Sequence, residues 1–73
     1  MKAKDTNMEE KVYRWEDYVP GMKLKTDRAL IKLKSEDFWR DAHWSKIECL
    51  WIDNGYYHKV YDEEMIAKIM FVD

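Results

Sequence analysis

Apolar and polar residues alternate along two stretches of the chain, and alternation with a period of two is the pattern of a half-buried β-strand. The first stretch is residues 22–34, where aliphatic side chains alternate with lysines on both sides of residues 26–29. This pattern predicts a β-hairpin whose turn is at residues 26–29. Its aliphatic side chains should face the core and its lysines should face solvent.

The second stretch, residues 47–61, carries the stronger strand signal. Its first half is rich in β-branched and aromatic residues, which favour strands. Asn54-Gly55 follows, and this pair is typical of a two-residue type I′ turn between paired strands. The pattern therefore predicts a second β-hairpin, in which Trp51 lies opposite His58.

A short helix is predicted between the two hairpins, over residues 35–42. Ser35 is a favourable N-cap, and the two acidic residues after it favour a first helical turn because they face the positive end of the helix dipole. Two other segments, residues 6–19 and 63–72, have apolar positions that fit either a helix or a strand. The pattern alone does not decide between these two structures.

The chain has 73 residues, which is the size of one domain. Residues 1–10 are polar and predict a partly flexible N-terminus, and residues 11–73 predict a single domain. Cys49 is the only cysteine, so no disulfide can form within the chain. Aromatic residues make up 15% of the chain, and we expect most of these large rings to build the small core.

Two regions of the chain carry a resemblance to a known family. Residues 16–24 combine an acidic pair, an aliphatic residue and a glycine before a strand, and residues 52–57 and 62–66 combine a central hairpin turn with a turn before a last strand. In these segments the chain resembles small SH3-like barrel proteins encoded by phages and prophages. The resemblance implies a mainly β fold, a small SH3-like barrel with one or two short helices, and it implies no catalytic residues. The alternative is an α+β fold with an antiparallel sheet and an N-terminal helix.

The net charge is −2 at pH 7, which argues against a strongly basic nucleic-acid-binding protein. The polar N-terminus is not followed by the apolar segment of a signal peptide, and no run approaches the ~18 apolar residues that a membrane span needs. A single cysteine is also typical of a reducing compartment. We therefore expect a cytoplasmic protein without membrane contact, located in the host cytoplasm if a phage encodes it.

The residue types that often carry chemistry form no recognisable motif in this sequence. Cys49 and His58 lack a third residue to orient a base, and we expect a buried thiol beside a half-buried imidazole. The two histidines also lack the close spacing of a metal site, and the two glycines stand alone rather than in a phosphate-binding loop. The expectation is a protein that is not an enzyme and that holds no metal or cofactor.

Two groups of residues are candidate binding surfaces. The first group is aromatic, because strand alternation leaves some of these rings exposed. Its members are Trp39, Trp44, Tyr56 and Tyr57. The second group is the basic face of the first predicted hairpin, which suits nucleic acid or an acidic protein, although outward lysines also protect sheet edges from aggregation. Its members are Lys23, Lys25, Arg28, Lys32 and Lys34.

These observations predict a small non-catalytic binding protein, a phage or prophage accessory protein that modulates a host protein as an inhibitor or adaptor. The aromatic group is the expected contact surface. Two alternatives stay open: a nucleic-acid-binding module that uses the basic hairpin at residues 22–34, and a self-associating structural component. The sequence leaves the oligomeric state and the identity of the partner open.

Overall fold

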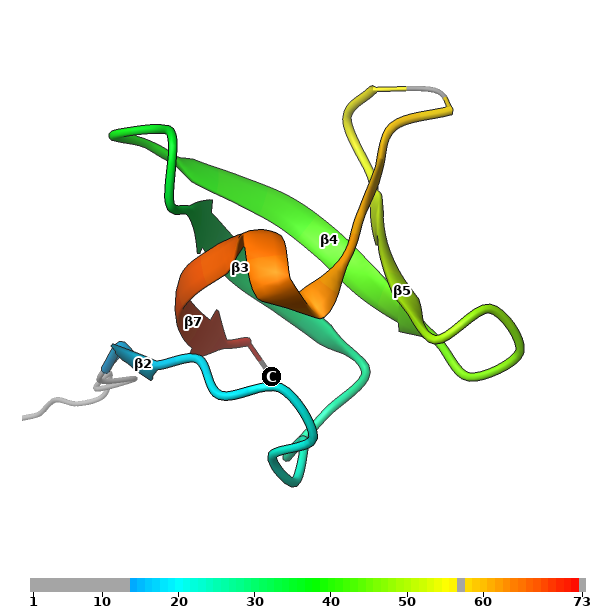
Figure 1. Cartoon of the computed structure of the whole chain (residues 1–73), viewed down its shortest axis with the longest axis horizontal. Helices are drawn as coiled ribbons and strands as arrows, with labels where there is room; N and C mark the ends of the chain where they lie inside the picture. Colours follow the sequence, from blue (N-terminus) through cyan, green and yellow to red (C-terminus); the bar gives the residue numbers. More distant parts are fainter. Residues whose placement is uncertain (1–13, 57, 73) are drawn as a thin grey trace, which may run out of the picture.

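The computed structural model of the protein describes residues 14–56 and 58–72. Within these residues the chain forms one antiparallel sheet of six strands and a single turn of 3₁₀-helix (Figure 1). The strands are β2 (Glu16–Asp17), β3 (Arg28–Leu33), β4 (Trp39–Ser45), β5 (Leu50–Asp53), β6 (Val60–Tyr61) and β7 (Ile66–Phe71), and the 3₁₀ turn is η1 (Glu63–Met65). Their order across the sheet is β2-β7-β3-β4-β5-β6. The prediction of a mainly β fold is confirmed.

Strand β3 lies inside the sheet and supplies much of its core. It pairs with β4 along one edge and with β7 along the other. Along the strand Ala29, Ile31 and Leu33 are buried, while the residues between them are only partly covered. The alternation predicted for the aliphatic residues of this segment is therefore confirmed, because one face of the sheet is packed and the other faces solvent.

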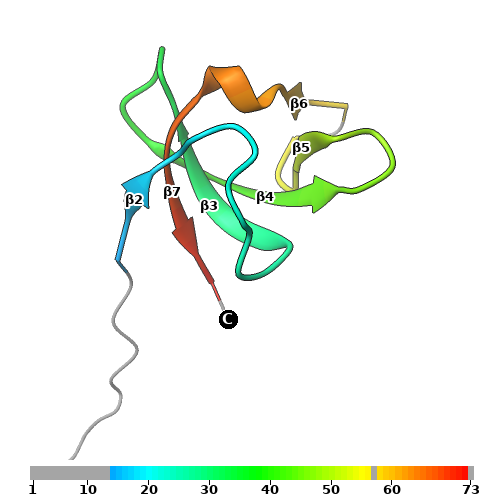
Figure 2. The same cartoon turned by 60° about the horizontal axis from the view of Figure 1, so that its bottom comes forward.

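The core lies on one face of the sheet and contains several of the large rings, as expected for a small chain. Its other buried apolar members are Tyr18, Ala42, Trp51, Tyr61, Ile66 and Ile69. Two parts of the chain lie over this face: the 3₁₀ turn η1 and the segment that follows β2 (Figure 2). The Tyr18 hydroxyl donates a hydrogen bond of 2.6 Å to Glu63 Oε2, which ties these two segments together.

The prediction of a first hairpin at residues 22–34 is wrong. Residues 22–27 form no strand, and β3 pairs with β4 and β7 instead of with the segment before it. Met22 and Leu24 pack against the core, so this connection crosses the open side of the core rather than extending the sheet. The apolar side chains of residues 22–27 are covered by packing against the core, and this packing does not require the segment to pair as a strand.

The helix predicted at residues 35–42 is also wrong. Strand β4 begins at Trp39 and pairs with both β3 and β5, and Ala42 at its centre is fully buried. This pairing gives β4 hydrogen-bonded neighbours on both sides, which outweighs the local helix signals from Ser35 and the acidic residues after it. The fold therefore has no α-helix among the described residues.

The second hairpin forms, but with a different register. Strands β5 and β6 pair with Trp51 opposite Tyr61, so the predicted partner His58 is wrong. Strand β5 ends at Asp53 and β6 begins at Val60, so the connection is longer than the predicted two-residue turn. The cause is Asp53, whose Oδ1 accepts hydrogen bonds from the backbone N–H groups of the two residues that follow Asn54. This Asx-type turn holds Asn54-Gly55 inside the longer loop.

The two undecided segments contain strands and no α-helix where the structure describes them. Residues 63–72 form η1 and then β7, and residues 14–19 contain β2 and no helix. The rest of the predicted N-terminal helix, and residues 1–10 with their predicted flexibility, lie outside the described residues. No helix in the described part of the chain has the length and apolar character needed to cross a membrane.

Candidate binding surfaces

Arg40 connects three parts of the fold near the start of β4. Its guanidinium donates from Nε and Nη2 to the two carboxylate oxygens of Glu36, both at 2.7 Å, and from Nη1 to Asp53 Oδ2 at 3.2 Å. Glu36 lies in the connection before β4, and Asp53 ends β5. The Arg40 side chain is only 11% exposed, so this bidentate pair is more rigid than an exposed ion pair.

Asp53 accepts hydrogen bonds from both backbone and side chains. Its Oδ1 accepts from the N–H groups of Gly55 at 2.7 Å and Tyr56 at 3.0 Å, and its Oδ2 accepts from the Tyr61 hydroxyl at 2.6 Å. Burial alone would raise the pKa of Asp53, but these hydrogen bonds and the one from Arg40 outweigh burial and lower the pKa. The carboxylate is therefore ionised at neutral pH and holds the chain between residues 53 and 56.

A hollow of about 270 Å³ lies beside this network, and we call it the Phe38–Tyr56 hollow. Its lining residues are Phe38, Trp39, Arg40, Asp41, Asp53, Gly55 and Tyr56. Phe38 is 51% exposed and Tyr56 is 61% exposed. The ring centroids lie 4.7 Å (Phe38) and 5.4 Å (Tyr56) from the Arg40 guanidinium carbon, so both rings rest against the buried network while presenting surface to solvent.

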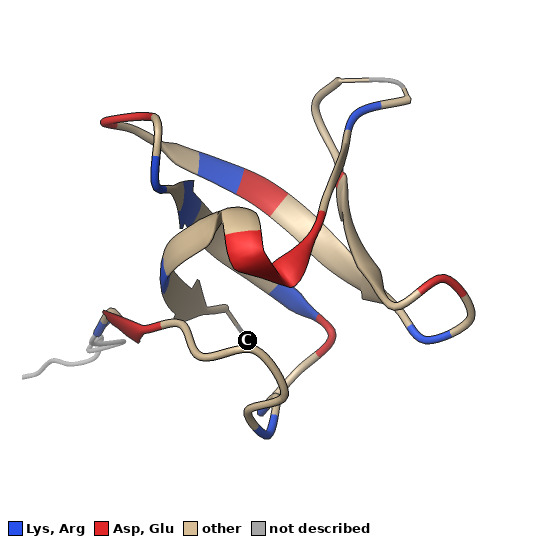
Figure 3. Ribbon diagram, in the orientation of Figure 1, with Lys and Arg blue, Asp and Glu red and all other residues tan. Residues whose placement is uncertain are grey.

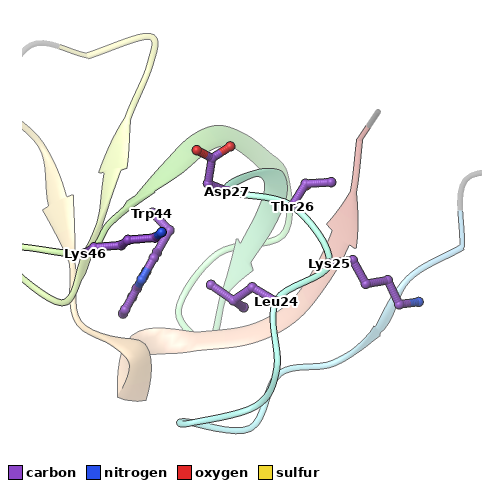
Figure 4. A pocket seen from close by; sticks show the side chains of 6 residues that line it. All are labelled: Leu24, Lys25, Thr26, Asp27, Trp44 and Lys46. Carbon is purple, nitrogen blue, oxygen red and sulfur yellow. The ribbon is translucent and has the colours of Figure 1, made fainter.

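A second cavity, of about 420 Å³, lies towards the other end of β4, and we call it the Trp44 groove (Figure 4). Its lining residues are Leu24, Lys25, Thr26, Asp27, Trp44 and Lys46. Figure 4 shows Leu24 pointing towards Trp44, with Lys46 beside the indole and Lys25 pointing away. The extended chain from Trp39 to Trp44 spans roughly 17 Å, so the groove and the hollow are separate surfaces.

Trp44 is fixed in this groove from two sides. Its ring packs against that of Trp51 with the centroids 5.6 Å apart, and its backbone N–H donates to the carbonyl of Asp27 at 2.7 Å. Ile47, in the turn after β4, is 96% exposed. Ile47 directly follows Lys46, which lines the groove, so an exposed apolar residue is next in sequence to the groove lining.

The predicted aromatic group is divided between these surfaces. Trp39 and Tyr56 line the Phe38–Tyr56 hollow, whereas Trp44 lines the Trp44 groove. Trp39 and Trp44 are an odd number of residues apart on one strand, which places them on opposite faces of the sheet. Tyr57 lies outside the described residues.

The hairpin that would carry the predicted basic face is absent, so the residues of this group lie on several elements. Three of its side chains pair with acids: Lys25 with Glu16 at 3.3 Å, Arg28 with Asp41 at 2.8 Å, and Lys32 with Asp37 at 3.2 Å. Figure 3 shows the basic residues spread over several elements with acidic residues between them. Lys23 and Lys34 are exposed on the connections before and after β3.

The residues considered for catalysis and metal binding have other contacts. Cys49 is exposed, so the expected buried thiol is wrong, and its Sγ lies 3.7 Å from the Lys46 carbonyl oxygen. The His43 Nδ1 lies within hydrogen-bond distance, 2.6 Å, of Asn54 Oδ1. In the described part of the chain, no three His, Cys, Asp or Glu side chains gather as metal ligands would.

Sequence reasoning missed Phe38 and Arg40, two of the residues that line the Phe38–Tyr56 hollow. One signal was present, because Glu36 and Arg40 are four residues apart with opposite charges. On the expected helix this spacing would have been an ordinary surface pair. In the structure the same pair joins a turn to a strand, so its role depends on the strand assignment.

Comparison with known proteins finds no matching family model, no matching curated protein and no matching solved structure. The functional argument therefore rests on the geometry of the two surfaces.

Proposed function

We propose that the chain is a small non-catalytic binding protein, a phage or prophage accessory protein that binds a host protein and modulates its activity. One observation carries the proposal: Phe38 and Tyr56 expose half or more of their rings on two connections that Arg40 ties together. Exposed aromatic side chains are frequent hot spots of protein interfaces. Because the Arg40 network holds these connections in place, little conformational entropy is lost when a partner binds.

We further propose that the fold is related to the SH3-like barrels that the sequence resembles. Strand β2 pairs with β7 at one edge of the sheet. Just after β2, the Tyr18 hydroxyl donates a hydrogen bond to Glu63 and accepts one from the indole N–H of Trp51. Trp51 lies in β5, next to the opposite edge. This contact between distant strands supports a curled, barrel-like arrangement joined by side chains.

The Phe38–Tyr56 hollow is favoured over the other candidate surfaces for physical reasons. Trp44 is half buried and packs on the core, so less of its ring is available to a partner. Most of the predicted basic residues are engaged with carboxylates, which weakens their attraction for phosphate groups. Phe38 and Tyr56 are exposed large apolar residues that line the Phe38–Tyr56 hollow, whereas the large apolar residues that line the Trp44 groove are partly buried.

The test is capture of partners from bacterial lysate with the tagged chain, with and without nuclease, and identification by mass spectrometry. We expect one protein at near-equal stoichiometry, unaffected by nuclease. Its affinity should fall by at least about thirtyfold in the Phe38→Ser/Tyr56→Ser double variant, since two hot-spot rings are lost.

The matched control is Ile47→Ser, which removes a more exposed apolar side chain in the turn at the far end of β4. Binding that resists the double variant but is lost with Ile47→Ser would move the contact to the Trp44 groove. Recovery that disappears with nuclease would support the nucleic-acid alternative instead. Light scattering at two concentrations tests self-association.

A further inference from the structure

The residues that line the Phe38–Tyr56 hollow include two carboxylates, those of Asp41 and Asp53, and one cation, Arg40. The guanidinium of Arg40 is shared between the carboxylates of Glu36 and Asp53. Asp41, also in the wall, is already paired with Arg28 through two hydrogen bonds of 3.2 and 2.8 Å. Two carboxylates therefore share one cation directly beside the hollow.

Three of the five N–H groups of Arg40 already donate to carboxylates, so little of this guanidinium is available to an anionic ligand. Its Nε and both terminal nitrogens donate to Glu36 and Asp53, and its side chain is only 11% exposed. An incoming carboxylate or phosphate would meet a guanidinium whose charge is already balanced by two carboxylates. The electrostatics of the wall therefore disfavour an anion and favour a cation.

The rings of the hollow have the same preference. The faces of aromatic rings carry partial negative charge and attract cations. Three rings, those of Phe38, Tyr56 and Tyr61, already lie 4.7 to 5.7 Å from the guanidinium carbon of Arg40. Phe38 and Tyr56 keep half or more of their surface open to solvent, so they can contact a second, external cation.

From this arrangement we propose that the Phe38–Tyr56 hollow accepts a lysine or arginine side chain of the protein partner. The cationic head lies near Glu36 and Asp53, and its aliphatic stem lies against the two rings. This inference rests on the proposed protein-binding function and adds the chemistry of the partner residue. One positive charge opposes it, that of the exposed Lys59. The pKa of Glu36 is lowered mainly by its hydrogen bonds from Arg40 and to a smaller degree by the charge of Lys59, which therefore lies near this carboxylate.

Four amino-acid probes test the inference without the natural partner: the N-acetyl amides of arginine, lysine, leucine and glutamate. Each is titrated at constant ionic strength into ¹⁵N-labelled protein. The reporters are the backbone N–H signals of Gly55 and Tyr56, because both groups donate to Asp53 in the wall. We expect saturable shifts with the arginine and lysine probes, with Kd about two- to fivefold below that of the leucine probe.

Two variants change the net charge beside the hollow in opposite directions. Glu36→Gln removes one negative charge and should weaken the lysine and arginine probes severalfold, whereas Lys59→Gln removes the competing cation and should strengthen them about twofold. Lys59 is exposed, so its variant should fold even if Glu36→Gln does not. Lys46→Gln at the far end of β4 is the control and should leave all four affinities unchanged.

The inference is overturned if the leucine probe binds as well as the cationic probes, or if the glutamate probe binds best. It is also overturned if Lys59→Gln weakens the cationic probes. These results would leave an apolar contact surface in place, so the proposed function would survive them. Partner capture that resists the Phe38→Ser/Tyr56→Ser variant would instead contradict the proposed contact surface, whatever the probes show.

Discussion

The indole Nε1 of Trp51 donates a hydrogen bond of 3.0 Å to the hydroxyl of Tyr18, 33 residues away in the chain. The same hydroxyl donates to Glu63 Oε2 at 2.6 Å, and this oxygen also accepts from the Gly21 N–H at 3.0 Å. Trp51 is fully buried, so its indole N–H depends on this one acceptor rather than on water. The chain of hydrogen bonds joins β5, the segment after β2 and η1 across the core.

The first prediction follows from that dependence. Tyr18→Phe removes the acceptor of Trp51 and the donor to Glu63 while it keeps the ring that packs edge-on against the indole. Leaving a buried N–H unsatisfied should lower the free energy of unfolding by about 1–3 kcal/mol. Urea denaturation followed by tryptophan fluorescence measures the change. Tyr56→Phe, at an exposed position, is the control and should change it by less than ~0.5 kcal/mol.

The strand β3 and its buried positions were predictable because their alternation depends only on which face of the sheet is packed. Ile31 and Leu33 are buried as the pattern predicts. Strand β4 was not predictable in this way, because Ser35 and the acids after it favour a local helix and only pairing with β3 and β5 makes residues 39–45 extended. Local signals were outweighed by contacts that a sequence pattern does not contain.

The candidate surfaces were predictable only in part, for the same reason. Tyr56, one of the four aromatic residues named from the sequence, is exposed, but the pattern did not identify which of the four would be. The separation of Trp39 from Trp44 follows from strand parity and required the strand assignment. The role of Arg40 was not predictable from the sequence, because its partner Asp53 is 13 residues away in the chain. Its position in the site is a consequence of the pairing of Ala42 with Asp53 in neighbouring strands.

The second prediction concerns Arg40 and stability. Arg40→Met would leave Asp53, whose side chain is 3% exposed, as a buried carboxylate without its cation. Removing one partner of a buried pair should lower the free energy of unfolding by roughly 3–5 kcal/mol. Arg40→Lys keeps the charge but cannot make the bidentate bond to Glu36, so its loss should be smaller.

The matched control for Arg40 is Arg28→Met. Arg28 also makes two hydrogen bonds to a carboxylate, Asp41, but its side chain is 63% exposed. Exposed pairs contribute at most about 1 kcal/mol, so this variant should be nearly as stable as the wild type. Equal losses for Arg28→Met and Arg40→Met would contradict the importance of burial in the Arg40 network.

The third prediction is that the protein loses stability in acid. Hydrogen bonds from Arg40 lower the pKa of Glu36, and hydrogen bonds from Arg28 lower that of Asp41. The pKa of Asp53 is also lowered, because its hydrogen bonds outweigh the opposing effect of burial. A carboxylate with a lower pKa in the folded state stabilises the protein above its unfolded pKa, and this contribution is lost as the pH falls through the folded pKa.

The free energy of unfolding should therefore be nearly constant between about pH 7 and pH 5 and should fall below about pH 4. Urea denaturation at a series of pH values measures this dependence. Glu36→Gln should show a shallower fall, because one of the three carboxylates no longer titrates. A protein that became more stable on acidification would disprove the prediction.

The fourth prediction concerns the turn that brings Tyr18 to the core. Gly21 has a φ of +86°, a conformation that favours glycine, and a Cβ added there would meet no atom within 4 Å. Gly21→Ala should therefore cost only backbone strain, about 1–2 kcal/mol in the free energy of unfolding. Gly21→Asn should cost less, because asparagine tolerates positive φ better than alanine. Thermal and urea denaturation of both variants measure the difference, and an alanine variant as stable as wild type would show that the turn changes its conformation.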